Sequence, residues 1–378
     1  MKKLPLLMLL ALAPAYSQAQ SSVTLYGIAD AGVLYVNNSG GHQLYSVASG
    51  NEQGTRWGLR VVEDLGSGLS AVAQLENGTN IMTGAALQGG RMFGRQSWVG
   101  LSHTQYGTLT LGRQYNPMQD LLAPLQIASS TSLTAFGSHP FDNDNIGLLV
   151  RQNNTAKYMT PTIGGFRAGA SYSFSNNTNF ARNRAYSAAL TYAMGPVTVA
   201  AGYSRFMNPA VSTDGALPSD NYYSAATTPF LASAQTVQQW GVGANYKMGS
   251  LILGAIYTGA LFENPTSGSL FSGATGSGGG TGSVRFQNAE LSARYYFRPD
   301  ILASIGESYT HATQGSGSGN YWQTSAGVQY FLSKRTDLYL NGLFMQTSSN
   351  LRAWFAYTPA PSSTDRQVAV VAGIRHKF

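Results

Sequence analysis

The chain has 378 residues and a formal net charge of +7, from 23 Lys and Arg against 16 Asp and Glu. It contains no cysteine, which excludes a disulfide framework and a thiolate metal site. Charged residues make up 10% of the chain, against about 25% in ordinary globular proteins, whereas aromatic residues reach 11%. So few charges indicate a surface that does not face water everywhere. The basic residues form no dense cluster, which argues against nucleic acid as a partner.

Residues 1–19 have the pattern of a secretory signal peptide. Two lysines precede an apolar run over residues 4–13, and small residues follow up to Ala19. Two prolines interrupt the apolar region, which is shorter than the roughly 20 residues that a membrane-spanning helix needs. We therefore expect cleavage after Ala19, export of the mature chain, and a single domain over residues 20–378.

From Ser22 onward, apolar and polar residues alternate with a period of two, which is typical of β-strands. The polar faces carry mostly Gly, Ser, Thr, Asn and Gln, as in a water-filled lumen, rather than the Lys and Glu of a soluble sandwich. The apolar faces tend to finish in Tyr, Phe or Trp, as the aromatic girdles of a membrane barrel do. Because no later stretch is long enough for a helical span, entry into a bilayer requires a closed barrel.

The connections between the candidate strands alternate between tight turns and long polar loops, which is the layout of outer-membrane barrels. Candidate strands begin near Ser22, Thr55, Leu69, Met92, Thr108, Asn153, Phe166, Arg184, Val197, Val237, Leu251, Val284, Ile301, Tyr321, Thr336 and Arg366. The sequence therefore predicts an all-β, transmembrane antiparallel β-barrel of about 16 strands, wide enough for an aqueous channel. Closure requires residues 366–378 to pair with residues 22–36, which places Phe378 on the lipid face.

The same alternation assigns charged residues to the lumen. Arg56 and Arg60, for example, lie on the face opposite Trp57. The basic residues expected in the lumen are Arg56, Arg60, Arg95, Arg151 and Lys157, and the acidic ones are Asp30 and Glu76. A wall of one sign concentrates counter-ions in a narrow pore. The alternative for each arginine is a salt bridge on the surface or in a loop.

Arg113 conflicts with this pattern, because it shares the outward face of Leu109 and Leu111. Either a β-bulge redirects its side chain, or the residue lies at a subunit interface where its charge is paired. We favour the interface.

Several motifs together resemble the Gram-negative general porins, in particular their β-proteobacterial branch. They are SSVTLYGIADAGV (residues 21–33), TRWGLRVVEDLGSGLSAVAQLE (residues 55–76), GRQSWVGL (residues 94–101), YGTLTLGRQY (residues 106–115) and the terminal Phe378. The resemblance implies a homotrimer of barrels, each with its own pore. It also implies that the outer-membrane assembly machinery reads Phe378, and that the third long loop, residues 116–145, folds into the lumen.

By this resemblance, Arg56, Arg95 and Arg151 match the arginine ladder of the family, with Arg60 and Lys157 nearby. Residues 135–144 resemble the constriction edge of the inward loop, so the loop residues expected at the constriction are Asp120, Phe136, Gly137, Asp142 and Asp144. Residues 121–139 contain no acid. Because basic groups outnumber acidic ones, the sequence predicts a preference for anions.

The predicted function is therefore an outer-membrane general diffusion porin for small hydrophilic solutes and ions, with lipid and lipopolysaccharide as its surroundings. A channel specific for phosphate or organic anions remains a second candidate. A barrel hydrolase is a third, for which Ser308 and His311 are the candidate residues. No cofactor is expected, and the five histidines show no metal-ligand spacing.

Overall fold

The computed structural model describes residues 21–130, 133–209, 214–219, 233–267, 269–271, 282–355 and 358–378. The expected signal peptide lies outside these residues. In chain order the strands are β1 (Ser22–Ser39), β2 (His42–Ser49), β3 (Arg56–Gly66), β4 (Leu69–Gly78), β5 (Gln96–His103), β6 (Gly107–Gln114), β7 (Gln152–Met159), β8 (Phe166–Ser173), β9 (Arg184–Met194), β10 (Val197–Met207), β11 (Thr236–Met248), β12 (Leu251–Glu263), β13 (Val284–Arg298), β14 (Ile301–Gln314), β15 (Gly317–Phe331), β16 (Thr336–Thr347) and β17 (Arg366–Lys377). The short helices are α1 (Pro117–Leu122), η1 (Ala123–Leu125), η2 (Ala135–Gly137) and η3 (Pro140–Asp142). None of the helices in the described ranges is long and apolar enough to cross a membrane.

The strands form one antiparallel sheet that closes on itself. Successive strands pair along the chain, and β1 pairs with β17 from Ile28 opposite Lys377 to Val36 opposite Ala369. On its other side, β1 pairs with β3 through its first half and with β2 through its second half. The 17 strands of the described sheet therefore occupy 16 positions, because β2 and β3 share one. The predicted closed barrel of 16 strands is confirmed.

The strand β2 is the element that the sequence did not predict. Between β2 and β3, residues 50–55 leave the sheet, and Asn51 and Glu52 are each only 1% exposed. Asp30 on β1 stabilises this interruption, because its Oδ2 accepts the backbone N–H groups of Glu52 at 2.9 Å and Gln53 at 2.7 Å. The interruption thus places the backbone and side chains of residues 50–55 inside the barrel.

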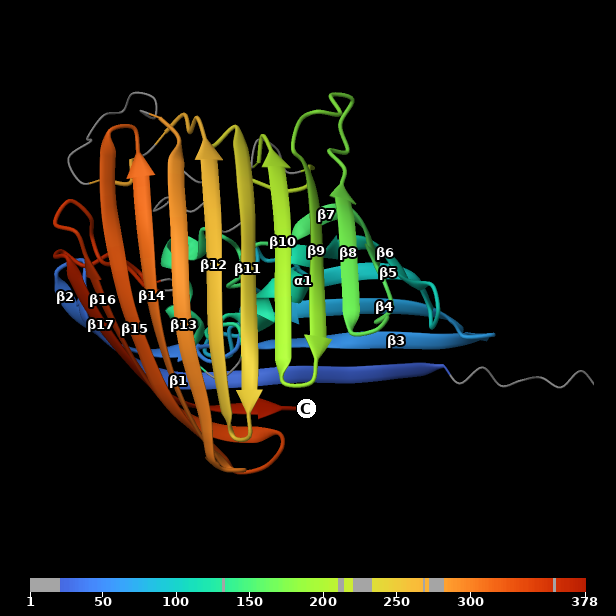
Figure 1. Ribbon diagram of the computed structural model, residues 1–378, viewed down its shortest axis with the longest axis horizontal. Helices are drawn as coiled ribbons and strands as arrows, with labels where there is room; N and C mark the ends of the chain where they lie inside the picture. Colours follow the sequence, from blue (N-terminus) through green and yellow to red (C-terminus); the bar gives the residue numbers. More distant parts are fainter. Residues whose placement is uncertain are drawn as a thin grey trace, which may run out of the picture.

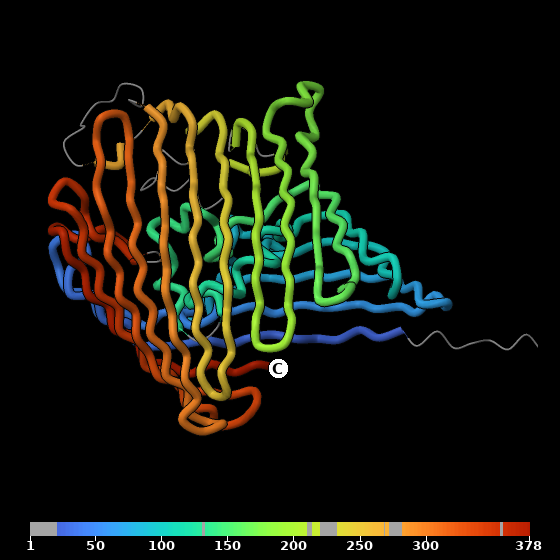
Figure 2. Tube along the Cα trace, in the orientation of Figure 1, coloured from blue at the N-terminus to red at the C-terminus, as the bar shows by residue number. Residues whose placement is uncertain are grey.

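The faces of the wall follow the predicted alternation. On β14, outward-facing Ile305 is 52% exposed, whereas inward-facing Ser304 and Ser308 are buried. Tight turns join the strands at one end of the barrel and longer segments join them at the other (Figure 2). With no solvent to satisfy backbone groups in a bilayer, closure of the hydrogen-bonded ladder is what permits a sheet to span it.

The described residues of the segment between β6 and β7 lie inside the ring of strands. Figure 1 shows α1 between the upright strands β8–β15 and the strands β3–β6 behind them. Inward-facing residues of the wall bind this segment: Gln323 donates to the Gly137 carbonyl at 2.8 Å, and Gln239 donates to the Asn143 carbonyl at 2.7 Å. From the opposite side, the N–H of Ala135 donates to the carbonyl of Asn51 at 2.9 Å.

Aromatic packing also holds the inward segment. Phe141 lies edge-on to Tyr321 and Trp354, with ring centroids 6.1 and 5.7 Å apart. Its neighbour Phe286 is 1% exposed, so these rings form an apolar core inside the lumen. A loop packed in this way is held against the inner side of the barrel wall, because moving it would open a void and protein interiors tolerate few voids.

Candidate channel constriction

Three arginines from different elements meet inside the barrel. Arg56 begins β3, Arg95 immediately precedes β5, and Arg151 immediately precedes β7. The Nη2 of Arg95 donates to the phenol oxygen of Tyr115 at 2.9 Å, and Arg151 donates to the same oxygen. The structure thus brings together the arginines that alternation assigned to the lumen.

Glu76 on β4 is the carboxylate within this group. Its Oε1 accepts from Arg95 Nε at 2.7 Å, and its Oε2 lies 3.9 Å from Arg56 Nε. Tyr26 donates its hydroxyl to the same carboxylate at 2.9 Å. The carboxylate of Glu76 therefore interacts with two guanidinium groups. The three arginines and Glu76 together keep a net positive charge.

The other predicted basic residues are placed differently. Lys157 donates to Asp120 Oδ2 at 2.7 Å, so the acid of α1 is paired with a cation. Arg60 is exposed, and its guanidinium carbon lies 5.8 Å from the ring centroid of Tyr26. Arg60 therefore lies beyond the three grouped arginines.

A cavity of about 200 Å³ lies between the arginines and the part of the inward segment that precedes Arg151. Arg56, Arg95 and Arg151 line it together with Glu52 and Gln53. The residues of the inward segment that line it are Ala128, Ser129, Ala135, Gly147, Leu148 and Leu149. The cavity thus has a basic side and an uncharged side.

The loop residues expected at the constriction are bound within the loop or to the barrel wall, and their place at the constriction stays a prediction. Phe136 and Gly137 are buried, and the carbonyl of Gly137 accepts from Gln323 of β15. Asp142 accepts the N–H groups of Gly147 at 2.6 Å and Leu149 at 3.1 Å, which fixes the turn that follows η3.

Asp144 is bound to His139 inside the same segment, with Oδ2 and Nδ1 2.7 Å apart. The other ring nitrogen of His139 lies 3.4 Å from Glu290 of β13. Burial disfavours a charged imidazole, but the two carboxylates outweigh it and raise the pKa of His139 to about 10. Burial opposes the charge of Asp144 as well, yet His139 holds the pKa of Asp144 below its usual value. The two groups form a buried ion pair.

Asp142 differs from Asp144 in its charge. Burial, followed by the neighbouring Asp144 carboxylate, raises the pKa of Asp142 to about 8. Asp142 is therefore mostly protonated at neutral pH. With Asp120 paired to Lys157 and Asp144 paired to His139, the acids of the inward segment add little negative charge to the lumen.

Two residues of the site were missed by sequence reasoning. Tyr115 binds two of the arginines, and Glu52 accepts from the side chains of Gln329 at 2.5 Å and Asn341 at 2.7 Å. Asp30, expected in the lumen, is buried and accepts from the Tyr339 hydroxyl at 2.6 Å. Tyr115 directly follows a strand in the motif that ends GRQY, which is the available signal for it.

Arg113 lies at a β-bulge. The pairing of β6 with β7 shifts between Gly112 and Gln114, and Arg113 donates to the Gly94 carbonyl at 2.7 Å. Its side chain lines a surface hollow with Ser97, whose strand neighbour Val99 is 59% exposed on the outward face. The bulge therefore does not send Arg113 into the lumen, and its place at an interface stays a prediction.

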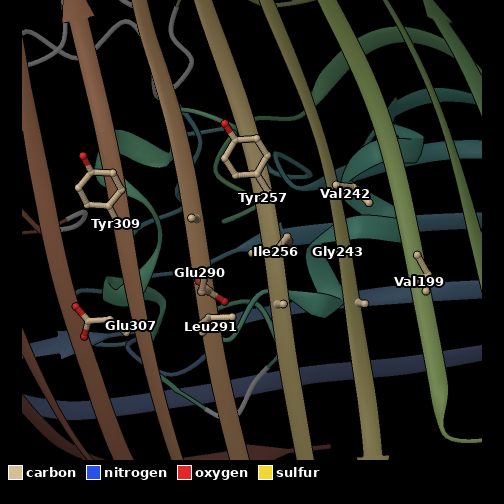
Figure 3. A pocket seen from close by; sticks show the side chains of 12 residues that line it. Val199, Val242, Gly243, Ile256, Tyr257, Glu290, Leu291, Glu307 and Tyr309 are labelled. Atoms are coloured by element: carbon tan, nitrogen blue, oxygen red, sulfur yellow. The ribbon is translucent and has the colours of Figure 1, made fainter.

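A second hollow, of about 570 Å³, lies on the outward face of β10–β14. Its lining includes Val242, Tyr257, Leu291 and Tyr309, which Figure 3 shows on neighbouring strands. Glu307 stands at its edge and accepts from the Thr324 hydroxyl at 2.5 Å. This apolar hollow faces away from the lumen and is separate from the arginine group.

The pair considered for a hydrolase does not form. Ser308 is buried on the inward face of β14, whereas His311 has outward parity and binds Asn320 at 2.7 Å. Within the described ranges, no group of three or more His, Asp and Glu side chains is placed to hold a metal ion.

Comparison with known proteins identifies the family. The profile of the Gram-negative porins matches residues 6–350. An outer membrane porin protein of Bordetella pertussis is 32% identical, with 96% of each chain covered, and outer membrane porin protein 32 of Delftia acidovorans is 29% identical over the full length of both. Among solved structures, an anion-selective porin from Comamonas acidovorans superposes with a TM-score of 0.75 and 25% identity, covering 95% of this chain and 100% of that one. The chain therefore belongs to the Gram-negative porin family.

Proposed function

We propose that this porin conducts small hydrophilic solutes and ions passively through the outer membrane and prefers anions. The observation that carries the proposal is the charge of the 200 Å³ cavity. Three guanidinium groups line one side with Glu52, and Glu76 is paired with Arg95, while the facing residues of the inward segment, from Ala128 to Leu149, that line the cavity carry no charge. Arginine stays charged at every physiological pH, so the positive potential persists.

The neutralised loop acids support the same preference. A carboxylate facing the arginines would attract cations to the constriction, but Asp120 and Asp144 are paired and Asp142 is mostly protonated at neutral pH. Among the relatives, one structure is named as an anion-selective porin. The constriction residues of this chain are thus Arg56, Arg95 and Arg151, with Arg60 and Lys157 as flanking charges.

The outer face supports assembly into a homotrimer. Outward residues of β5 and β6 are aliphatic, with Val99, Leu101, Leu109 and Leu111 each at least 50% exposed. On β13 and β15, exposed aromatic residues such as Phe297 and Tyr330 form the girdle that suits a lipid interface. We propose that the aliphatic side contacts neighbouring subunits, with Arg113 at its rim, that lipid and lipopolysaccharide contact the aromatic side, and that the assembly machinery reads Phe378.

The test is a reversal potential in planar bilayers under a KCl gradient, with protein purified from outer membranes. Stepwise insertions with reversal toward the chloride equilibrium potential support the anion-preferring channel. Reversal toward the potassium potential contradicts the assignment of the basic constriction. Absence of any conductance from folded trimers contradicts the channel itself.

The arginine cavity also suits a channel specific for phosphate or organic anions, because guanidinium groups bind oxyanions in a forked geometry. Addition of phosphate to chloride solutions separates the two cases. A chloride conductance that falls and saturates at low phosphate indicates a specific site. A conductance that changes only in proportion to ion composition indicates general diffusion.

A further inference from the structure

Tyr115 contacts more of the basic residues than any acid of the constriction does. Its phenol oxygen accepts from Nη2 of Arg95 at 2.9 Å and from Nη2 of Arg151. The guanidinium carbon of Arg151 lies 4.8 Å from its ring centroid. Its backbone carbonyl accepts from Lys157 Nζ at 2.9 Å. Cations from two separate segments of the chain, one before β5 and one at the start of β7 and within it, therefore meet at a single residue.

The fold fixes Tyr115 itself before it meets these cations. Tyr115 lies between the end of β6 and the cap of α1, where Asn116 accepts the N–H of Gln119 at 2.9 Å. Pro117 follows at the first helical position, where its fixed φ suits the start of a helix. Tyr115 is 8% exposed, so its ring has little freedom to move.

A phenol hydroxyl can orient guanidinium groups without cancelling their charge, which a carboxylate cannot do. Guanidinium groups gathered around a small cavity repel one another, and long side chains need partners to hold one geometry. Glu76 orients Arg95, but its negative charge also cancels part of the positive potential. A phenol oxygen has two lone pairs, so it can orient two guanidinium groups without removing charge from the pore.

We propose that Tyr115 is the positioning residue that sets the strength of anion preference, by holding Arg95 and Arg151 at the constriction without adding a negative charge of its own. This inference rests on the proposed function. It predicts that the phenol oxygen, rather than the bulk of the ring, controls selectivity. Tyr115 acts through the arginines and does not need to touch the permeating ion.

The test compares Tyr115→Phe with Tyr106→Phe in planar bilayers. Tyr106 lies in the turn before β6 and is 70% exposed, so the same change there removes a hydroxyl that holds no arginine. We expect Tyr115→Phe to lower the chloride to potassium permeability ratio by about threefold. Without the phenol oxygen, the guanidinium groups of Arg95 and Arg151 occupy more positions and lie farther on average from the permeating anion, which weakens their attraction for it. Tyr106→Phe is expected to leave the ratio unchanged.

A double-mutant cycle separates positioning from a general structural role. In an Arg95→Ala, Arg151→Ala background, Tyr115→Phe is expected to change the permeability ratio far less than in wild type, because the groups that it positions are gone. An equal change in both backgrounds overturns the inference. Heat resistance of the trimer, measured for every variant, shows whether a change in selectivity accompanies a loss of folding.

The outcomes distinguish the two proposals. A wild-type channel that prefers potassium overturns the proposed anion preference. A wild-type channel that prefers chloride, together with an unchanged ratio in folded Tyr115→Phe, overturns the role of Tyr115 alone. A lowered ratio with retained heat resistance and a reduced effect in the Arg95→Ala, Arg151→Ala background supports both.

Discussion

Phe378 and Gly27 close the barrel through two backbone hydrogen bonds. The N–H of Gly27 donates to the carbonyl of Phe378 at 3.0 Å, and the N–H of Phe378 donates to the carbonyl of Gly27 at 3.1 Å. The ring of Phe378 covers Gly27 so closely that a Cβ there would lie 2.3 Å from its Cζ and 2.8 Å from the Arg56 carbonyl oxygen. The absence of a side chain at residue 27 is therefore what lets this ring pack against β1.

Gly27→Ala is accordingly expected to weaken barrel closure. The added methyl forces the Phe378 ring and the neighbouring backbone to move, at a cost of about 1–3 kcal/mol. The measurement is the midpoint of heat-induced unfolding in detergent. Gly342→Ala is the matched control, because a Cβ there would meet no heavy atom within 4 Å. Equal unfolding midpoints for the two variants would show that packing of the Phe378 ring against β1 does not require a glycine at residue 27.

Glu76→Gln is expected to increase anion preference. The amide keeps the size of the side chain and an oxygen that accepts from Arg95, but it removes the negative charge beside Arg95 and Arg56. We expect the chloride to potassium permeability ratio to rise by about threefold at low salt and by less at high salt, since screening shortens the reach of the charge. Asp300→Asn, in an exposed turn, is the control for loss of one acid. A ratio that falls in Glu76→Gln would contradict the charge assignment.

The inward segment is expected to loosen at alkaline pH. The pKa of His139 is raised to about 10, so its stabilisation is complete below its usual pKa of 6.5 and is lost as the pH rises through 10. The raised pKa of Asp142, about 8, has the same sign, because deprotonation places a charge in a buried site, but this effect develops above its usual value of 3.8 and is complete once the pH has risen through 8. The lowered pKa of Asp144 acts oppositely, since its stabilisation is present above its usual value of 3.8 and is lost in acid.

These signs predict that current fluctuation increases as the pH rises from 6.5 to 10, and that above pH 8 the increase comes from His139. His139→Gln removes the positive partner of Asp144 and is expected to produce those fluctuations at neutral pH. His42→Gln serves as the control, because His42 is exposed on β2. Current recordings of His139→Gln that match wild type across this range would exclude the ion pair as the anchor of the loop.

Two ion pairs of similar geometry are expected to differ in their contribution to stability. Arg375 and Asp337 are 3.0 Å apart and almost fully buried, whereas Arg298 and Asp300 are 2.5 Å apart with Arg298 65% exposed. Asp337→Ala leaves a buried guanidinium without its carboxylate, which costs about 3–5 kcal/mol. Asp300→Ala changes an exposed pair, which contributes little to stability because solvent screens it. Heat-induced unfolding midpoints of the two variants check the difference, and similar midpoints would contradict it.

The sequence by itself determined the barrel and the basic side of its lumen. A period of two is a local property of the chain, so the parity of Arg56 and Glu76 could be read without knowing which strands pair. Turn residues are equally local, and they placed most strand starts within a few residues of those observed. Strand β2 was not predicted, because residues 50–55 interrupt its continuation into β3. The side chain of Asp30, on another strand, stabilises that interruption.

Tertiary structure alone decided what each charge does. Asp142 and Asp144 lie in the segment that the sequence assigned to the constriction, yet Asp142 accepts backbone N–H groups of Gly147 and Leu149, and Asp144 is paired with His139, so both act as structural groups. Tyr115 became the centre of the arginine group only because Arg95 and Arg151, 20 and 36 residues away, fold onto its hydroxyl. Charge state and hydrogen-bond partnership depend on burial and on neighbours from distant segments, which local periodicity does not encode.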